Sequence, residues 1–329
     1  MIISRTPYRI SFVGGGSDYP AYYENYGVGE VISTTINKYC HISCHPLPPF
    51  YEVKHKIVWS KVELVNDIME IEHPVIRESL QWASYSNKKL GLEIHHIGDL
   101  PARSGMGSSS SFTVGLTVCL LEQLGLAWTQ RIVALRAIDV ERHKLGEYVG
   151  DQDQFAAAFG GFNHMQFRPL SKGGVKVMSL NIKDKDQLES RLMLFYTGIQ
   201  RIASKVAAEV VKSIPERAGT ITRLCKLVRP ARFALEDGEL DDFGRILHEA
   251  WMLKRQQSSV VSNMTIDSIY EKAIQAGALG GKLLGAGAGG FMLFYVPEDK
   301  KFAVTKALSE YKHVPFKFES EGVKVWNLN

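Results

Sequence analysis

The chain has 329 residues, 45% of them hydrophobic and 22% charged, which is enough for one large or two medium-sized domains and typical of a soluble globular protein. Its formal net charge of +4 is spread without a long Lys/Arg run, so it suits small anionic ligands and argues against nucleic acid as a partner. No signal-peptide pattern and no apolar stretch of about 18 residues occurs, so we expect a cytoplasmic protein with no membrane partner.

β-Branched residues dominate the first hundred positions, and this pattern predicts strands. The expected strands cover residues 8–15, 30–47, 51–64 and 92–102. Apolar residues at helical spacing interrupt and follow this series. They predict helices over residues 73–87, 109–125 and 129–147, and a turn-rich stretch follows over 148–167.

The second half of the chain is mostly helical in pattern. After a strand over 191–198 we expect helices over residues 202–212, 217–236, 240–258, 266–277 and 300–311, and a last strand over 323–328. A charged, loop-like segment near residues 180–190 separates the strand-rich first part from the mostly helical second part, and we place a domain boundary there.

Four cysteines are present, and Cys40 and Cys44 lie with two histidines in the segment CHISCH. This segment is strand-like, so the two thiols would share a face about 13 Å apart, with the histidines on the other face. One tetrahedral zinc ion cannot collect such a set. We therefore expect reduced structural cysteines.

The segment PARSGMGSSSS, residues 101–111, combines glycines with four serines at the expected start of a helix. Gly105 and Gly107 permit close backbone approach and positive φ angles. The unpaired amides of a first helical turn attract an anion, and serine hydroxyls there can bind a Mg²⁺ that bridges phosphates. A well-capped helix after a plain loop would have the same composition, so the residues alone leave both interpretations open. The Walker A and protein-kinase motifs do not occur.

A second glycine cluster covers residues 280–290, where Gly285, Gly287 and Gly290 match the dinucleotide-binding pattern G-x-G-x-x-G. The cluster is expected to follow a helix and precede a strand, whereas the dinucleotide motif follows a strand and opens a helix. We therefore disfavour an oxidoreductase. A loop that supports another phosphate-binding segment, or a plain tight turn, fits the cluster better.

Two further stretches combine charged residues with turns. In RISFVGGGSDY, Arg9 and Asp18 flank three glycines, which suits either a polar substrate site or a hairpin turn capped by Asp18. In GDQDQF, Asp153 can orient a hydroxyl or accept its proton, and Glu141 upstream could complete a Mg²⁺ shell. Taken one at a time, such acidic residues are more often solvated surface groups.

Together, these four stretches in this order resemble the GHMP small-molecule kinases, such as galactokinase, homoserine kinase and mevalonate kinase. PARSGMGSSSS is similar to the family motif P-x-x-x-G-L-G-S-S-A-A, with Met106 in place of Leu and Ser110 and Ser111 in place of the two Ala. The resemblance implies an α+β fold of two domains. The ribosomal-S5-like N-terminal domain would cover residues 1–185 with the phosphate loop 101–111, and the ferredoxin-like C-terminal domain residues 186–329 with the glycine loop 280–290.

Three stretches are especially similar to the D-glycero-D-manno-heptose 7-phosphate kinases of this family: RTPYRISFVGGGSDYPAYY, GDQDQFAAAFGGFN and WMLKRQQSSVVSN with the glycine loop. Galactokinase-type chains carry E-H-T-D where this chain has Gly15, Gly16, Ser17 and Asp18, which counts against galactose. The resemblance implies ATP-dependent phosphorylation of the anomeric hydroxyl to give the 1,7-bisphosphate, in nucleotide-activated heptose synthesis for bacterial surface polysaccharide. The alternatives are a kinase of a free sugar such as L-fucose or another small alcohol, and a non-catalytic nucleotide- or sugar-binding relative.

The resemblance also implies roles by position. Asp153 would be the catalytic base, and Arg9 would stabilise charge on the transferred phosphoryl group. Ser108 and Glu141 would bind Mg²⁺. The ATP phosphates would lie against Arg103, Ser104, Gly105, Met106, Gly107, Ser108 and Ser109. The serines at the two alanine positions would pack the helix with spare hydroxyls.

The sugar phosphate and ATP are the expected partners of a monomer or homodimer. The expected contacts of the sugar are Gly15, Gly16, Ser17, Asp18 and Gly287. For its phosphate group we expect Arg201, Lys254 and Arg255, although cations on a helix surface explain these three residues equally well.

Overall fold

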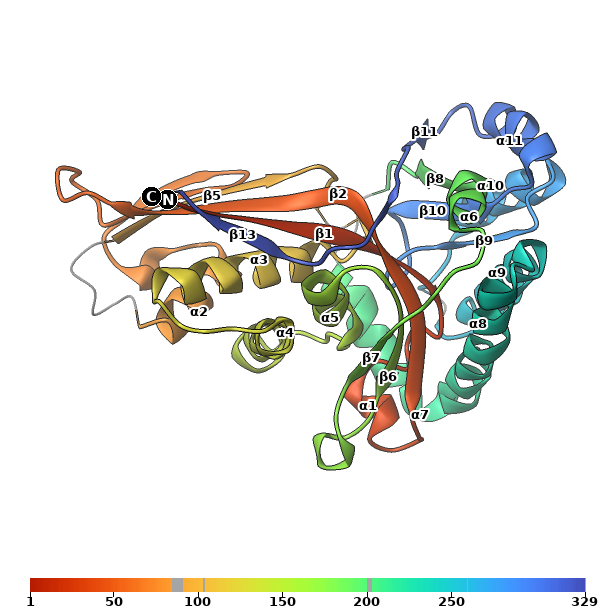
Figure 1. Ribbon diagram of the computed structural model, residues 1–329, viewed down its shortest axis with the longest axis horizontal. Coiled ribbons are helices and arrows are strands. Elements are labelled where there is room, and N and C mark those ends of the chain that lie inside the picture. Colours follow the sequence, from red (N-terminus) through yellow and green to blue (C-terminus); the bar gives the residue numbers. More distant parts are fainter. Residues whose placement is uncertain (85–90, 103, 200–202, 259, 329) are drawn as a thin grey trace.

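The structure of the protein is a computed structural model that describes residues 1–84, 91–102, 104–199, 203–258 and 260–328. It contains two sheets, with helices packed on one face of the first sheet and around the second (Figure 1). Within the described ranges, no helix combines the length and apolar character that a membrane span requires.

The first sheet has nine strands and is largely antiparallel. Its main path runs β13-β1-β2-β5-β3-β4, with β6 and β12 paired to β2, and β7 paired to β6. The bounds of these strands are β1 (Ile2–Val13), β2 (Gly29–Leu47), β3 (His55–Val58), β4 (Val62–Val65), β5 (Gly91–Gly98), β6 (Phe162–Phe167), β7 (Lys176–Ser179), β12 (Phe318–Glu319) and β13 (Lys324–Asn327).

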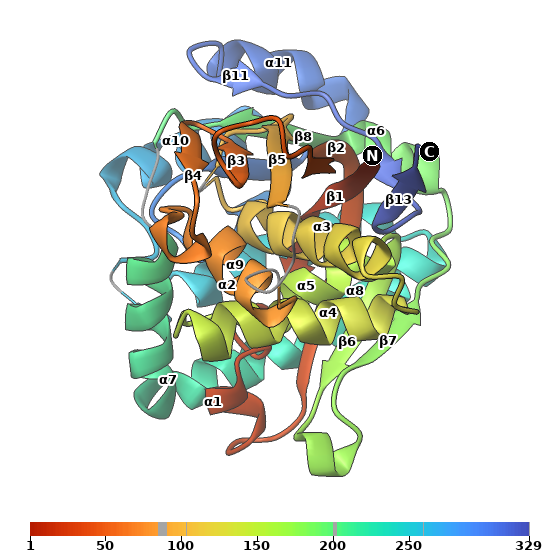
Figure 2. The ribbon, with the colours of Figure 1, turned by 90° about the vertical axis from the view of Figure 1, so that its left-hand side faces the viewer.

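Helices cover one face of this sheet (Figures 1 and 2). The helix α3 (Ser108–Gln123) lies directly against β1 and β2 and is buried on every side from Ser110 to Leu121, because its residues are small or apolar all round. The remaining helices of this half are α1 (Pro20–Tyr23), α2 (Pro74–Trp82), α4 (Gln130–Ile138) and α5 (Gln152–Phe159). A π-helical segment, Asp139–Lys144, continues α4.

The second sheet has four antiparallel strands in the order β11-β8-β10-β9. The bounds of its strands are β8 (Leu192–Tyr196), β9 (Gly280–Leu283), β10 (Phe291–Tyr295) and β11 (Lys312–His313). The helices of this half are α6 (Lys185–Arg191), α7 (Ala203–Lys226), α8 (Val228–Asp237), α9 (Leu240–Lys254), α10 (Met264–Gln275) and α11 (Lys301–Ala307). Short 3₁₀ turns lie at Ile68–Glu70, Leu170–Lys172 and Glu298–Lys300.

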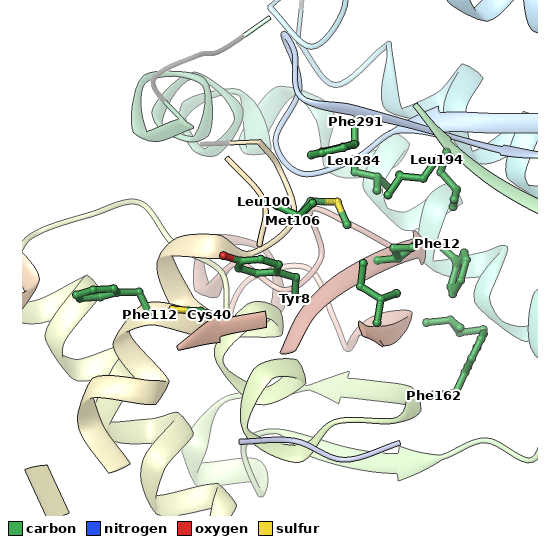
Figure 3. Packing of buried hydrophobic residues seen from close by; sticks show 14 of the residues in the cluster. Tyr8, Phe12, Cys40, Leu100, Met106, Phe112, Phe162, Leu194, Leu284 and Phe291 are labelled. Carbon is green, nitrogen blue, oxygen red and sulfur yellow. The ribbon is translucent and has the colours of Figure 1, made fainter. Parts of the chain in front are cut away.

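A continuous hydrophobic core joins the two halves. Phe12 of β1 stacks on Phe162 of β6, with ring centroids 5.2 Å apart, and meets Phe243 of α9 edge-on at 5.4 Å. Figure 3 shows Met106 of the phosphate loop pointing toward Leu284 within the same core. The division into residues 1–185 and 186–329 stays a prediction. The two parts share this core, and β12 and β13 of the second part pair with the sheet of the first part.

Several expected elements are confirmed, including the strand over 30–47 and the helices over 109–125, 240–258 and 266–277, each within a few residues of its observed bounds. Cys40 and Cys44 are buried on the same face of β2, and the four cysteines are unpaired thiols.

Three local expectations are wrong. The single strand over 51–64 is a hairpin of β3 and β4. The expected break at 213–216 is absent, since α7 continues through Pro215 because Ile214 and Ile221 anchor it in the core. The turn-rich stretch contains α5, whose alanine-rich sequence favours a helix between Asp151 and the glycine pair that ends it.

Candidate active site

A cavity of about 300 Å³ opens between the two halves of the chain. Its wall combines the end of β1 and the following turn, the start of α3, residues 147–154, and α7 and α9. Lys282 of β9 and, after it, Gly285 and Ala286 of the glycine loop complete it. Segments from both halves of the sequence therefore build one site.

The start of α3 faces this cavity with free backbone amides. Gly107 occupies the N-cap position in the left-handed region, with φ of 73°, and as a glycine it contributes no side-chain cap. Ser108, Ser109 and Ser110 line the cavity at the first turn. An uncapped helix N-terminus with these amides and hydroxyls is a binding site for a phosphate group.

The two glycine loops pack directly against each other. A Cβ atom on Gly290 would lie 2.1 Å from the carbonyl oxygen of Ser104, and one on Gly105 would lie 2.5 Å from that of Leu284. Glycine is required here because the two backbones occupy the space of a side chain. The cluster at 280–290 is thus a loop between two strands, β9 and β10, that supports the phosphate loop, rather than a loop after a helix as expected.

Some residues assigned to ligands have other roles in the structure. The Met106 side chain lies in the core, and its carbonyl accepts a hydrogen bond from the Arg9 amide at 3.1 Å. Ser104 is buried, and neither it nor Gly287 lines the cavity. A Cβ on Gly287 would lie 2.7 Å from Val261, so this glycine permits close packing rather than ligand contact. Arg103 lies outside the described residues.

Arg9 and Asp153 form the central ion pair of the site. Arg9 donates from Nε and Nη2 to the two carboxylate oxygens of Asp153, both at 2.7 Å, and from Nη1 to the carbonyl of Gly105 at 2.7 Å. The Arg9 side chain is 5% exposed and that of Asp153 is 26% exposed. One guanidinium thus fixes the first strand, the phosphate loop and the start of α5 together.

The turn after β1 presents Asp18 to the cavity. The Ser17 hydroxyl donates to the Gly14 carbonyl at 2.7 Å and closes the turn. Ser17 was expected to contact the sugar, but it does not line the cavity. Asp18 is buried, and one carboxylate oxygen accepts from the Gly16 amide at 3.1 Å. Burial, and then the nearby Asp153 carboxylate, raises the pKa of Asp18 to about 6. Gly15 and Gly16 line the cavity beside it.

Glu141 lies behind the cavity wall instead of in it. Its carboxylate accepts hydrogen bonds from Ser110 at 3.0 Å, from Thr113 at 2.7 Å and from the Gln154 amide. The side chain is fully buried, and this burial raises the pKa of Glu141 to about 7. Ser110 therefore has a defined partner, as does Ser111, which donates to the Pro7 carbonyl at 3.0 Å; the expectation of spare hydroxyls is wrong.

Two of the three cations expected to hold the substrate phosphate, Lys254 and Arg255, lie within the described residues. Lys254 lines the cavity, but its ammonium donates to the carbonyls of Leu283 at 2.8 Å and Gly285 at 2.5 Å. Arg255 pairs with Asp267 at 3.0 Å and does not line the cavity, so its expected role is not supported by its position. Arg201 lies outside the described residues.

Sequence reasoning missed several polar groups of the wall, among them Lys282, Gln257 and Gln152. Lys282 is buried and donates to the Phe12 carbonyl at 2.6 Å, and burial lowers its pKa to about 7. Gln257 donates to the Gly15 carbonyl at 3.1 Å and thereby holds the turn. Gln152 lies beside Asp153. For Lys282, its position within the glycine loop 280–290 was an available signal, whereas nothing local marks Gln257.

Comparison with known families gives two matches. The model for the GHMP kinases N terminal domain matches residues 68–161, and that for the GHMP kinases C terminal matches residues 231–313. The first contains α3 and Asp153, and the second contains α9 and the glycine loop. Both matched regions thus contribute to the cavity wall.

Similar proteins cover the whole chain. A D-glycero-alpha-D-manno-heptose 7-phosphate kinase from Campylobacter jejuni is 33% identical over 99% of both chains. The crystal structure of a D-glycero-D-manno-heptose 1-phosphate kinase from Bacteroides thetaiotaomicron is 28% identical, with a TM-score of 0.76 over 100% of both chains. A putative sugar kinase of known structure from Campylobacter jejuni is 32% identical, with a TM-score of 0.71 over 99% of this chain and 98% of that one.

Proposed function

Because the chain belongs to the GHMP kinase family, we propose that it is an ATP-dependent kinase that phosphorylates the anomeric hydroxyl of D-glycero-D-manno-heptose 7-phosphate and forms the 1,7-bisphosphate. The observation that carries this proposal is the 33% identity to a heptose 7-phosphate kinase over 99% of both chains. The Arg9–Asp153 pair and the uncapped start of α3 on one cavity support phosphoryl transfer.

The triphosphate of ATP would lie at the start of α3. The amides of residues 107–109 and the helix dipole favour negative charge there, and no acidic residue in the first turn opposes it. The glycine loop holds this segment from behind through the close contact of Gly290 with Ser104. Such a preorganised loop needs little rearrangement when the phosphates bind.

Asp153 is the proposed acceptor of the substrate's proton. As the sugar oxygen forms its bond to the γ-phosphorus, the bond from that phosphorus to the leaving ADP oxygen breaks, and the hydroxyl proton passes to the carboxylate of Asp153. Arg9 orients this carboxylate through two hydrogen bonds and supplies positive charge beside the transferred group. Positioning and charge thus account for most of the chemistry.

Mg²⁺ is the expected companion of ATP, and the donor set fits it in part. The Ser108 hydroxyl lines the cavity and would hold the ion, whereas the Glu141 carboxylate does not reach the cavity. We propose that Glu141 orients Ser110 and Gln154, which do line it, instead of binding the ion itself. The bound ion would neutralise charge on the β- and γ-phosphates.

A cytoplasmic location and a monomeric or homodimeric state belong to this proposal as predictions. The cytoplasm is where ATP and sugar phosphates are available to a kinase.

The test is ADP release over a panel of acceptors, with ³¹P NMR to locate the new phosphate. The panel contains heptose 7-phosphate, heptose 1-phosphate, mannose, L-fucose, galactose and mevalonate, because the names of the two heptose-phosphate relatives differ in the phosphate position. We expect the highest kcat/KM with the 7-phosphate and a new signal from an anomeric phosphate. Asp153→Asn is the inactive control. Preference for a free sugar, or a product phosphorylated elsewhere, would contradict the proposal.

A further inference from the structure

Ser11 Oγ on β1 and Gln152 Oε1 at the start of α5 belong to the cavity wall and have no hydrogen-bond partner among the described residues. The residues are 5% and 6% exposed, so bulk water does not satisfy these atoms. A buried polar group without a hydrogen bond is destabilising, and buried polar groups in native proteins are nearly always paired. Each atom therefore calls for a partner that the protein itself does not supply.

Most other unpartnered polar atoms of the described residues lie away from the cavity. Ser4 Oγ lies on the same strand and is equally buried and unpartnered, but it does not line the cavity. Gln154 Oε1 does line it, but the amide nitrogen of that residue is already engaged by Glu141. The Ser11 hydroxyl and the Gln152 carbonyl oxygen are both without a hydrogen-bond partner within the described residues.

The two residues lie on segments that are tied together on both sides of them. On one side, Arg9 is paired with Asp153. On the other side, the carbonyl of Asp18 accepts a hydrogen bond from the amide of Asp151 at 3.0 Å. Ser11 lies between the ties on the first segment, and Gln152 lies between them on the second. The fold therefore holds these two segments of the cavity wall side by side.

The chemistry of the two groups defines what can bind to them. The carbonyl oxygen of Gln152 only accepts hydrogen bonds, and the serine hydroxyl both donates and accepts. The Asp18 carboxylate beside them adds another acceptor. A phosphate group has few or no protons to donate, so it would leave the Gln152 oxygen unpaired. A sugar hydroxyl donates and accepts, and it satisfies both residues.

We infer that Ser11 and Gln152 form a hydroxyl-binding subsite that recognises a sugar hydroxyl other than the one that accepts the phosphoryl group. This inference rests on the proposed function and adds the residues that select the sugar. The subsite lies next to the Arg9–Asp153 ion pair, where the phosphoryl group is transferred. It therefore binds the acceptor sugar rather than the nucleotide. Loss of either group weakens sugar binding and leaves ATP binding unchanged.

The experiment compares Ser11→Ala and Gln152→Leu with two matched controls. Ser4→Ala removes an equally buried, unpartnered hydroxyl from the same strand, and Gln275→Leu makes the same glutamine change on the exposed face of α10. Steady-state kinetics give KM for ATP and for heptose 7-phosphate. Calorimetry gives the affinity for heptose 7-phosphate alone. Monodeoxy analogues of this sugar identify the hydroxyl that Ser11 and Gln152 bind.

Each subsite variant should raise KM and Kd for the sugar about tenfold, with KM for ATP within twofold of the wild type. In the wild type, one deoxy analogue should bind about tenfold more weakly, and Gln152→Leu should bind this analogue and the parent sugar equally well. Variants that match their controls, or that lose ATP and sugar affinity alike, would overturn the subsite.

The proposed function is tested separately by the wild type. If the wild type prefers another sugar of the panel, the same comparison is made with that sugar. The result of that comparison then tests the subsite independently of the proposed substrate. If the wild type binds and phosphorylates no sugar, both proposals are wrong.

Discussion

Replacing Arg9 with lysine tests whether the geometry of the guanidinium, and not its charge, organises the site. Arg9 makes three hydrogen bonds at 2.7 Å, two of them to the carboxylate of Asp153. A lysine ammonium keeps the charge but cannot reproduce a two-point contact. With one nitrogen in place of three, it cannot hold both carboxylate oxygens and the Gly105 carbonyl in their present positions.

The expected loss follows from these contacts. A hydrogen bond to a charged group contributes about 1.5–3 kcal/mol, and lysine can restore part of what Arg9→Lys removes. A net loss of about 2–4 kcal/mol in transition-state stabilisation corresponds to a decrease of about 30- to 1,000-fold in kcat/KM. Most of the decrease should appear in kcat, because the Asp153 carboxylate loses its orientation toward the reacting hydroxyl.

The assay is ADP release with each substrate varied in turn, together with thermal unfolding. Arg255→Lys is the matched control, since Arg255 pairs with Asp267 outside the cavity at 3.0 Å and is partly exposed. This control should keep kcat/KM within threefold of the wild type. If Arg9→Lys also stays within threefold, or if both variants lose the same activity, the reasoning about Arg9 is refuted.

Three further predictions concern the loops and carboxylates around this pair. Gly290→Ala places a Cβ 2.1 Å from the Ser104 carbonyl at a φ of 108°, so it should lower the melting temperature and raise KM for ATP more than Gly219→Ala, an exposed helical position with open space; equal effects would contradict the loop contact. Ser110→Ala removes a donor to Glu141 and should weaken Mn²⁺ binding in the presence of ATP about tenfold by paramagnetic resonance, whereas Ser111→Ala should not; tighter binding would show that Ser110 shields Glu141 from the ion. Because the folded pKa of Asp18 is raised to about 6, the folded state favours the protonated carboxyl, and the stability cost of ionisation grows as the pH rises from about 4 to 6. Asp18→Asn should therefore stabilise the protein in denaturant unfolding by about 2–3 kcal/mol at pH 8 and by about half as much at pH 5, with loss of sugar binding; an equal gain at both pH values would contradict this origin.

The sequence predicts the parts of the site that local patterns encode. Gly105, Gly107 and the serines after them indicate a helix start that faces an anion, because backbone conformation and capping are properties of a few neighbouring residues. The family motifs add an order of segments that resemblance can recognise. The same patterns locate Asp153 and Arg9 as candidates.

The contacts between distant segments could not be predicted in this way. Arg9 and Asp153 are 144 residues apart, and Lys282 donates to a carbonyl 270 residues away. A run of serines does not reveal that Ser110 bonds to Glu141, because the partner is chosen by how the π-helical segment packs on α3. Lys254 looks like a free cation in the sequence, yet the fold uses its ammonium to hold the carbonyls that lead into the glycine loop.

The pairing of β12 and β13 with the first sheet has a consequence for biosynthesis and for truncation. The Thr35 hydroxyl of β2 donates a hydrogen bond to the carbonyl of Glu319 in β12, 284 residues further along the chain. β13 covers the outer edge of β1. During translation, the edge of the first sheet at β1 therefore stays unpaired until β13 has been synthesised. A fragment ending near residue 185 would keep this edge unpaired and prone to join other chains. The first sheet is thus completed only by strands from the end of the chain, and complementary fragments would have to be produced together to give all nine strands.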